Sequence, residues 1–215
     1  MPMRKIDLET WPRRKHFNVY NQFDYPHFNL TFSVETTEFQ AWVKARHDSF
    51  TLAVACLLAR VANEMPSFRL RIRGADVIEH EVVHPSFTIL LESELFSFCT
   101  VRYQHDYEGF QVAGSLRIEE TRRNPTLEDE PGQDDLLFMT SLPWIHFTSM
   151  MHPIHMHPVD SVPRIAWGRI DHHGDQQVMP LSVQVHHALM DGLHVGRYAE
   201  RVQYLLKNPE ELLKS

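Results

Sequence analysis

Two residues near the C-terminus have the types and the spacing of a proton-transfer site. The stretch PLSVQVHHALMDGLHVG runs from Pro180 to Gly196 and places His187 at the end of an expected strand, four residues before Asp191. A histidine in a structured, partly dry setting is the side chain best suited to take a proton from a hydroxyl near neutral pH. The acid-glycine step at Asp191 predicts a tight local turn rather than a continuous helix.

The elements on either side of this pair must hold the imidazole in place. Residues 178–185 have the pattern of a strand and lead directly into His187. Residues 192–207 carry apolar side chains at helical spacing, which predicts a helix after the turn. That stripe consists of Leu193, Val195, Tyr198, Val202 and Leu205.

The rest of the chain alternates between expected helices and strands. Apolar spacing predicts a helix over 36–46, with Thr36 or Thr37 as the cap. The strongly apolar segment 50–65 predicts a buried helix, and a further helix is expected over 107–122. The charged, proline-broken segment 119–135 predicts a solvated loop. This mixture indicates an α/β (α+β) two-layer sandwich, a mixed sheet covered by helices, built as a single domain over 1–215. The remaining expected strands are 68–73, 77–83, 86–91, 98–103, 136–142 and 164–170.

Composition excludes several other classes of protein. The formal net charge of −7, with no compensating basic run, argues against non-specific nucleic-acid binding. The longest apolar run, Leu52 to Leu58, is too short to span a bilayer, and the N-terminus lacks the apolar core of a signal peptide. Cys56 and Cys99 lie in apolar segments and are expected to be buried free thiols. We therefore expect a cytoplasmic protein without a membrane partner.

Motifs at both ends of the chain resemble those of one enzyme family. The stretch from Pro180 to Arg197 is similar to the active-site signature of the chloramphenicol acetyltransferases. The N-terminal element from Trp11 to Phe17, the pair Phe96-Ser97 and the mid-chain Leu142-Pro143-Trp144 also match, in the right order. The resemblance implies a homotrimer of α/β sandwich subunits with active sites in the clefts between neighbours. It also implies acetyl transfer from acetyl-CoA to a hydroxyl, with antibiotic resistance as the associated role.

The resemblance assigns four residues to catalysis. His187 matches the general base, while Asp191 matches a structural carboxylate whose ion-pair partner is Arg13. If this pair is buried, losing one partner is expected to cost roughly 3–5 kcal/mol. Thr140 falls where the family usually carries a serine that stabilises the oxyanion, and threonine keeps the donor with a stiffer side chain. The alternatives are a buried structural histidine, an unrelated surface acid and arginine, and an ordinary strand threonine.

The acceptor pocket is where the sequence departs most from the family. Tyr20 and Phe96 match its aromatic lining, but other positions change, which predicts an acceptor that can differ from chloramphenicol. On the coenzyme side, Arg169 keeps a positive charge near the expected adenosine end, whereas Ala166 and Ser49 replace a hydroxyl residue and a lysine. The altered acceptor positions are Asp24, Ser86, Phe98, Phe138, Met150 and His152.

Two other functions compete with acetyl transfer. The Thr140, Ala166 and Asp24 departures would fit a non-catalytic trimeric small-molecule binder that kept the fold. The His- and Met-rich segment 150–158 would suit a soft metal, but it lacks the fixed Cys/His spacing of a structural zinc site. We therefore expect pocket lining there, and no metal cofactor.

Overall fold

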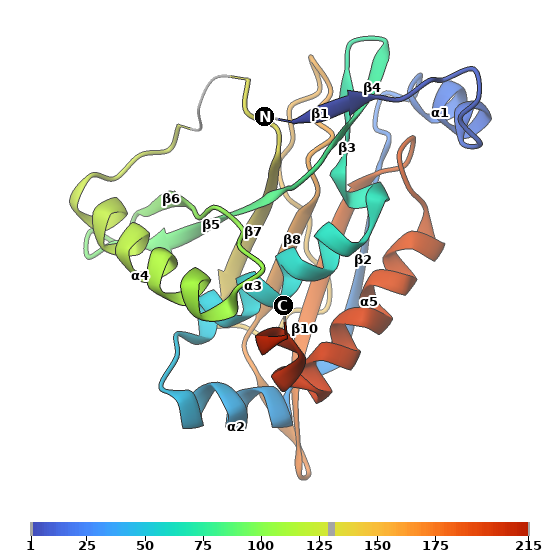
Figure 1. Cartoon of the computed structure of the whole chain (residues 1–215). Helices are drawn as coiled ribbons and strands as arrows, with labels where there is room; N and C mark the ends of the chain where they lie inside the picture. The colour runs from blue at the N-terminus through green and yellow to red at the C-terminus, as the bar shows by residue number, and fades with distance from the viewer. Residues whose placement is uncertain (1, 129–131, 215) are drawn as a thin grey trace.

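A computed structural model describes residues 2–128 and 132–214, and its centre is a mixed seven-stranded sheet (Figure 1). The strand order is β2-β10-β8-β7-β5-β6, with β9 paired to β10. The β5-β7 and β7-β8 pairs are parallel, and the other pairs are antiparallel. The expected mixed sheet is therefore correct. The strands are β2 (His27–Glu35), β5 (His84–Leu90), β6 (Phe96–Thr100), β7 (Leu136–Leu142), β8 (Arg164–Gly168), β9 (Asp171–His173) and β10 (Gln176–His186).

Helices cover one face of this sheet and form the main core with it (Figure 1). Helix α3 is buried over Leu52–Ala62 because nearly every residue of that stretch is apolar. Leu181, Val183 and Val185 of β10 point toward the helices, as their alternation requires. The covering helices are α2 (Thr37–Arg46), α3 (Phe50–Glu64), α4 (Tyr107–Arg123), α5 (Gly192–Lys207) and the short 3-10 helix η2 (Pro209–Leu213).

A smaller three-stranded sheet packs together with the N-terminal segment and the turn that follows β10. It has the order β1-β4-β3 and lies near the short helix α1 (Figure 1). Phe17 of α1 packs in a second apolar cluster that contains Ala188 and Leu189. The N-terminal segment therefore supports the turn that follows His187. The elements are β1 (Met3–Lys5), α1 (Arg14–Tyr20), the 3-10 helix η1 (Pro66–Arg69), β3 (Leu70–Arg73) and β4 (Asp76–His80).

Several expected boundaries require correction. The strand expected over 68–73 begins as a 3-10 turn, because Pro66 at the helix start directs the chain into η1. The strand expected over 98–103 runs over Phe96–Thr100 instead. Helix α4 extends to Arg123 before the charged loop, of which residues 129–131 lie outside the described part of the chain. Strand β2 and helix α1 were not predicted.

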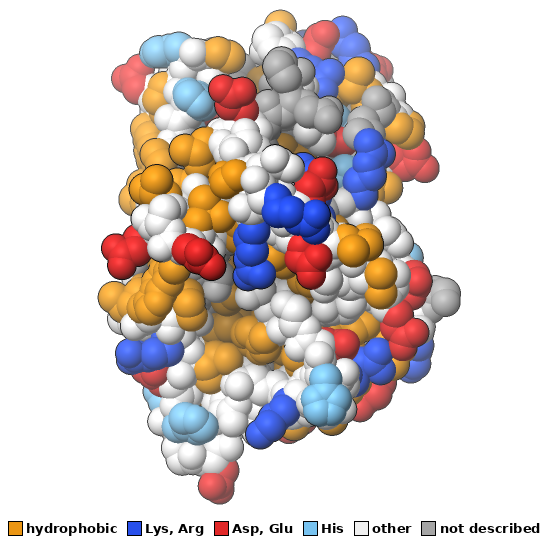
Figure 2. All heavy atoms as spheres, turned by 90° about the vertical axis from the view of Figure 1, so that its left-hand side faces the viewer, with side chains coloured by type: hydrophobic (Ala, Val, Ile, Leu, Met, Phe, Trp, Pro, Cys, Tyr) orange, Lys and Arg blue, Asp and Glu red, His pale blue; other side chains and the backbone are white. Residues whose placement is uncertain are grey.

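The sheet face opposite the helices carries mostly polar side chains from its central strands. On β10 these are Ser182, Gln184 and His186, all buried, and the register aligns Ser182 with Thr31 of β2 and Ala166 of β8. The irregular chain between β7 and β8 runs over this face, since Ser182 and Gln184 bond to its backbone. Apolar side chains also remain exposed at the β6 edge of the sheet. Figure 2, which views the molecule from this edge, shows hydrophobic groups gathered on one side of the surface. None of the helices in the described ranges is long and apolar enough to cross a membrane.

Candidate active site

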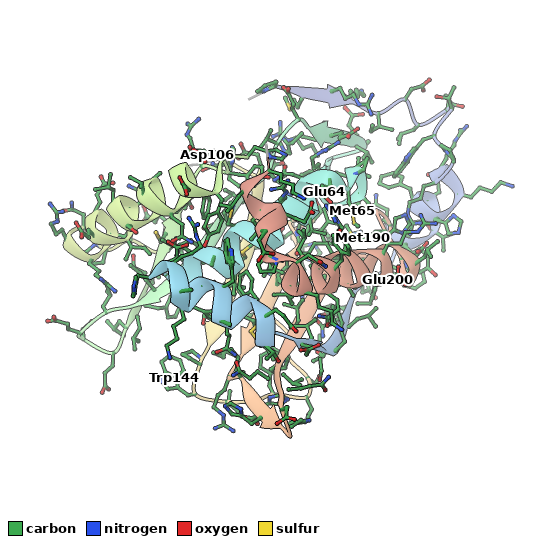
Figure 3. All side chains as sticks on the ribbon, turned by 60° about the horizontal axis from the view of Figure 1, so that its bottom comes forward. Glu64, Met65, Asp106, Trp144, Met190 and Glu200 are labelled. Atoms are coloured by element: carbon green, nitrogen blue, oxygen red, sulfur yellow. The ribbon has the colours of Figure 1, made fainter. Side chains whose placement is uncertain are left out.

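The His187 ring lies in the turn between β10 and α5, with one of its two nitrogens engaged. Its Nδ1 lies 3.2 Å from the carbonyl oxygen of Met190, which is labelled in Figure 3. A carbonyl only accepts hydrogen bonds, so Nδ1 carries the proton and Nε2 keeps its lone pair. Tyr20 stacks on the imidazole with 3.9 Å between ring centroids, and Phe28 lies 4.8 Å away. This aromatic setting fixes the ring plane while Nε2 remains an acceptor.

Arg13 holds the whole turn together from the N-terminal segment. Its guanidinium donates to the carbonyls of Ala188 (3.0 Å) and His187 (2.8 Å) and to Asp191 Oδ2 (2.9 Å). The ion pair that the resemblance implies is therefore present, and it is largely shielded on the arginine side, where 12% of the side chain is exposed. The planar fork of arginine is suited to such a set of acceptors.

Asp191 is both the ion-pair partner and the N-cap of α5. Its side chain accepts from the N–H of Leu193, and its own N–H donates to His194, which completes a capping box. Although burial alone would raise the pKa of Asp191, the hydrogen bond and the positive charge of Arg13 hold it well below its ordinary value. The expected turn at Asp191-Gly192 is thus a capped helix start.

The expected acceptor residues divide into two groups in the single chain. Tyr20 lies at the His187 turn, and Asp24 lies exposed after α1. The rest lie on the sheet or over it. Ser86 accepts a hydrogen bond from Thr100, Phe98 packs near Phe96, and Phe138 lies under the Arg164 guanidinium at 5.1 Å. Phe98 also lines a cavity of about 400 Å³ at the outer edge of β6, together with Thr100 and Arg102. Met150 and His152 belong to the segment that runs over this face.

Thr140 lies in the middle of the sheet face, beside Ala166 in the register of β7 and β8. Its hydroxyl oxygen is 3.3 Å from Nε2 of His152. Burial lowers the pKa of His152 to about 4, with a smaller contribution from the charge of Arg164, so its imidazole is neutral at pH 7.

Within one chain, Thr140 and His187 are too far apart to act on the same atoms. Thr140 is aligned with Ala166 and Ala166 with Ser182, and His187 follows Ser182 by five residues. Two spacings between neighbouring strands and, at right angles to them, five residues of extended chain separate the two Cα atoms by roughly 19 Å. A base and an oxyanion donor must each approach the reacting group to about 3 Å. The two could therefore meet only across a contact between subunits.

The two polar residues expected on the coenzyme side, Arg169 and Ser49, have partners within the chain that the sequence did not predict. Arg169 is exposed, but its Nε donates to Asp171 Oδ1 at 2.8 Å, so its charge is already paired. Ser49 is the N-cap of α3 and accepts from the N–H of Leu52. Trp144, whose carbonyl accepts from Arg169, is labelled in Figure 3 in a different part of the molecule from Met190.

The structure also contains contributors that the sequence interpretation overlooked. Gln184 exchanges two hydrogen bonds with the backbone of His152, and Phe28 packs on His187. Phe28 could have been found, since residues 28, 30, 32 and 34 are all apolar and alternate as in a strand. Within the described ranges, His, Cys, Asp and Glu side chains do not gather in groups of three or more that could hold a metal.

The fold first defines a class of enzyme. A solved chloramphenicol acetyltransferase superposes with a TM-score of 0.86 at 25% identity, over 95% of this chain and 100% of the other. The cubic core of a pyruvate dehydrogenase complex shares the fold alone, with a TM-score of 0.68 at 18% identity over 93% of this chain and 88% of the other. The architecture is that of an acyltransferase.

Sequence comparison narrows the class to a family. The family model described as chloramphenicol acetyltransferase matches residues 1–203. The chloramphenicol acetyltransferase of Streptomyces acrimycini is 32% identical over 95% of this chain and 94% of that protein. One from Klebsiella sp is 29% identical over 92% and 91%. The chain therefore belongs to the chloramphenicol acetyltransferase family.

Proposed function

We propose that this protein transfers an acetyl group from acetyl-CoA to a hydroxyl of chloramphenicol or a related small molecule, with His187 as the general base. The observation that carries the proposal is the state of the His187 ring. Because Nδ1 donates to Met190, the lone pair of Nε2 is left to accept a proton from a hydroxyl.

The reaction proceeds directly between the two substrates. Nε2 takes the hydroxyl proton as the acceptor oxygen attacks the thioester carbonyl carbon. The tetrahedral oxyanion then collapses, the carbon–sulfur bond breaks, and the leaving CoA sulfur takes the proton back from the imidazolium. Bringing both substrates into one site supplies much of the rate, so no covalent enzyme intermediate is required.

Thr140 is the proposed donor to the oxyanion, and it would come from a neighbouring subunit. The separation of roughly 19 Å within one chain supports this arrangement. Exposed apolar side chains support it as well, because a monomer rarely leaves such surface open. Following the family resemblance, we propose a homotrimer with three active sites at its interfaces. The exposed apolar residues in question include Val19, Phe23, Leu30, Leu90, Leu95, Phe96 and Met151.

The first test measures release of the CoA thiol from acetyl-CoA with and without chloramphenicol. The His187→Ala variant is compared with His172→Ala, which changes an exposed histidine in β9. Loss of general-base catalysis is expected to lower kcat by about 10²–10⁴, while the control keeps its rate. If another hydroxyl compound, and not chloramphenicol, caused thiol release that depends on His187, the proposed chemistry would stand and the acceptor would be that compound. Ligand binding with no thiol release across a broad acceptor panel would favour the non-catalytic binder.

A further inference from the structure

His152 occupies a defined position over the sheet face. It belongs to the irregular segment between β7 and β8, and its backbone is held at two points by one side chain. Gln184 accepts from the N–H of His152 at 2.7 Å and donates to its carbonyl at 3.3 Å. Gln184 is itself buried near the C-terminal end of β10. The place of the imidazole is therefore set by the sheet rather than by a free loop.

The imidazole contacts the hydroxyl proposed to stabilise the oxyanion. Nε2 of His152 lies 3.3 Å from Oγ1 of Thr140, while Nδ1 is buried without a partner in the described part of the chain. The neighbour of Thr140 in the next strand, Ala166, offers no side-chain hydrogen bond. His152 is thus the polar side chain that touches this hydroxyl.

The direction of the hydrogen bond follows from which donor, the second ring N–H or the threonine O–H, can be left without an acceptor. If Thr140 donated to Nε2, the ring proton would sit on Nδ1, a buried nitrogen without an acceptor. If Nε2–H donates to Oγ1, the hydrogen left without an acceptor is the hydroxyl hydrogen of Thr140, a side chain that is only half-buried. A buried donor without an acceptor is more costly than one that can reach solvent, so the second arrangement is favoured.

We propose that His152 is a positioning residue that donates from Nε2–H to Thr140 and thereby directs the threonine hydroxyl proton toward the acyl oxygen. This rests on the proposed acetyl transfer. Threonine is stiffer than serine about its first side-chain bond, and a fixed donor from His152 selects the hydroxyl direction. The charge of the imidazole does not change in this role, since burial keeps the ring neutral. His152 would act on kcat rather than on acceptor binding.

The kinetic test uses three variants in a double-mutant cycle. His152→Leu removes the ring nitrogens, His152→Gln keeps an amide N–H near the place of Nε2, and Thr140→Val removes the hydroxyl. We expect His152→Leu to lower kcat by about tenfold or more with KM changed less than about twofold, and His152→Gln to regain part of the loss. In the Thr140→Val background, His152→Leu should have little further effect. An equal loss in both backgrounds, or a change in KM alone, would overturn the proposal.

A second measurement does not depend on activity. The ring nitrogens of the ¹⁵N-histidine-labelled protein report the tautomer of His152, assigned by comparison with His152→Leu. We expect the Nε2–H form at pH 7 and a shift of the Nε2 resonance in Thr140→Val. The Nδ1–H form would refute the proposal even in an active enzyme. A protein that shows the Nε2–H form but acetylates no acceptor would instead refute the proposed function.

Discussion

Arg13 and Asp191 are 178 positions apart in the chain and form an ion pair with 2.9 Å between Nη1 and Oδ2. The same guanidinium donates to the carbonyl of His187 itself. The residue proposed as the base is therefore held by the opposite end of the sequence. This arrangement links the stability of the fold to the geometry of the reaction.

Arg13→Ala is expected to damage both properties. The change removes three hydrogen bonds and leaves the Asp191 carboxylate without its partner, which should reduce the free energy of unfolding by about 2–4 kcal/mol. Urea unfolding measures this loss, and thiol release measures the accompanying fall in kcat. Arg14→Ala, which removes the exposed partner of Glu9, is the matched control. Equal, small effects of the two variants would show that the ion pair has no special structural role.

Mixed assemblies can test whether the site is shared between subunits. We expect His187→Ala and Thr140→Val proteins to be nearly inactive when purified separately. When the two are co-expressed, some interfaces combine an intact histidine turn with an intact sheet face, and activity should exceed that of either parent. Sedimentation equilibrium checks that the assembly is a trimer. If the mixed preparation is no more active than the average of its parents, each site lies within one chain.

Acid should destabilise the protein well before its carboxylates titrate. Burial lowers the pKa of His186 to about 3 and that of His152 to about 4, from 6.5, and it also lowers the pKa of His27. The unfolded chain therefore binds protons first as the pH falls below about 6.5, and the stability present above that pH is lost progressively toward pH 4. Each such histidine contributes up to about 1.4 kcal/mol per pH unit in this window.

Denaturant midpoints at pH 7 and pH 5 measure this dependence. His186→Asn keeps an acceptor near the place of Nδ1, which receives the N–H of Ala188, but it cannot titrate. The variant should therefore show a shallower loss of stability between the two pH values. An unchanged slope would mean that His186 is accessible to protons in the folded state.

The acceptor pocket offers a gain-of-function prediction. Phe98 occupies a position where the family resemblance predicts a small alanine, and it lies beside Phe96 and lines the cavity at the edge of β6. Phe98→Ala should open space for chloramphenicol and lower its KM by about three- to tenfold, with kcat little changed. Leu213→Ala changes an exposed apolar side chain of the 3-10 helix η2, which is not part of the proposed site or interface, and serves as the control. A higher KM after Phe98→Ala would show that the ring contacts the acceptor.

The four long helices, α2 to α5, and most of the strands could be predicted from the apolar patterns of the sequence. Helix α3 is apolar throughout its middle, and β10 leads into the expected turn. Strand β2 was overlooked although its apolar residues alternate. Helix α1 has only seven residues, and its position depends on Phe17 packing against the β10 turn, so a local pattern could not reveal it.

The site was predictable as a set of residues but not as a geometry. Family motifs pointed to Arg13, His187 and Asp191, and Arg13 bonds to both of the other residues. The pairing of Arg169 with Asp171 and the two-point hold of Gln184 on His152 were not predictable, because side-chain partners across a fold leave no spacing signal in one sequence. The departures from the family suggested altered binding, whereas the contact of His152 with Thr140 suggests a role in the chemistry as well.

The separation between the histidine turn and the sheet face gives each chain two independent surfaces. The bonds that hold His187 run to Arg13 and Met190, and neither residue belongs to the sheet face where the acceptor side changes. Under the proposed function, substitutions at Phe98 or Phe138 would therefore change recognition of the acceptor without touching His187. In that arrangement one surface carries the proton acceptor, while the sheet face carries both acceptor recognition and the oxyanion donor Thr140 with its partner His152. Only those recognition positions that do not touch Thr140 or His152 can then change while the reaction is kept.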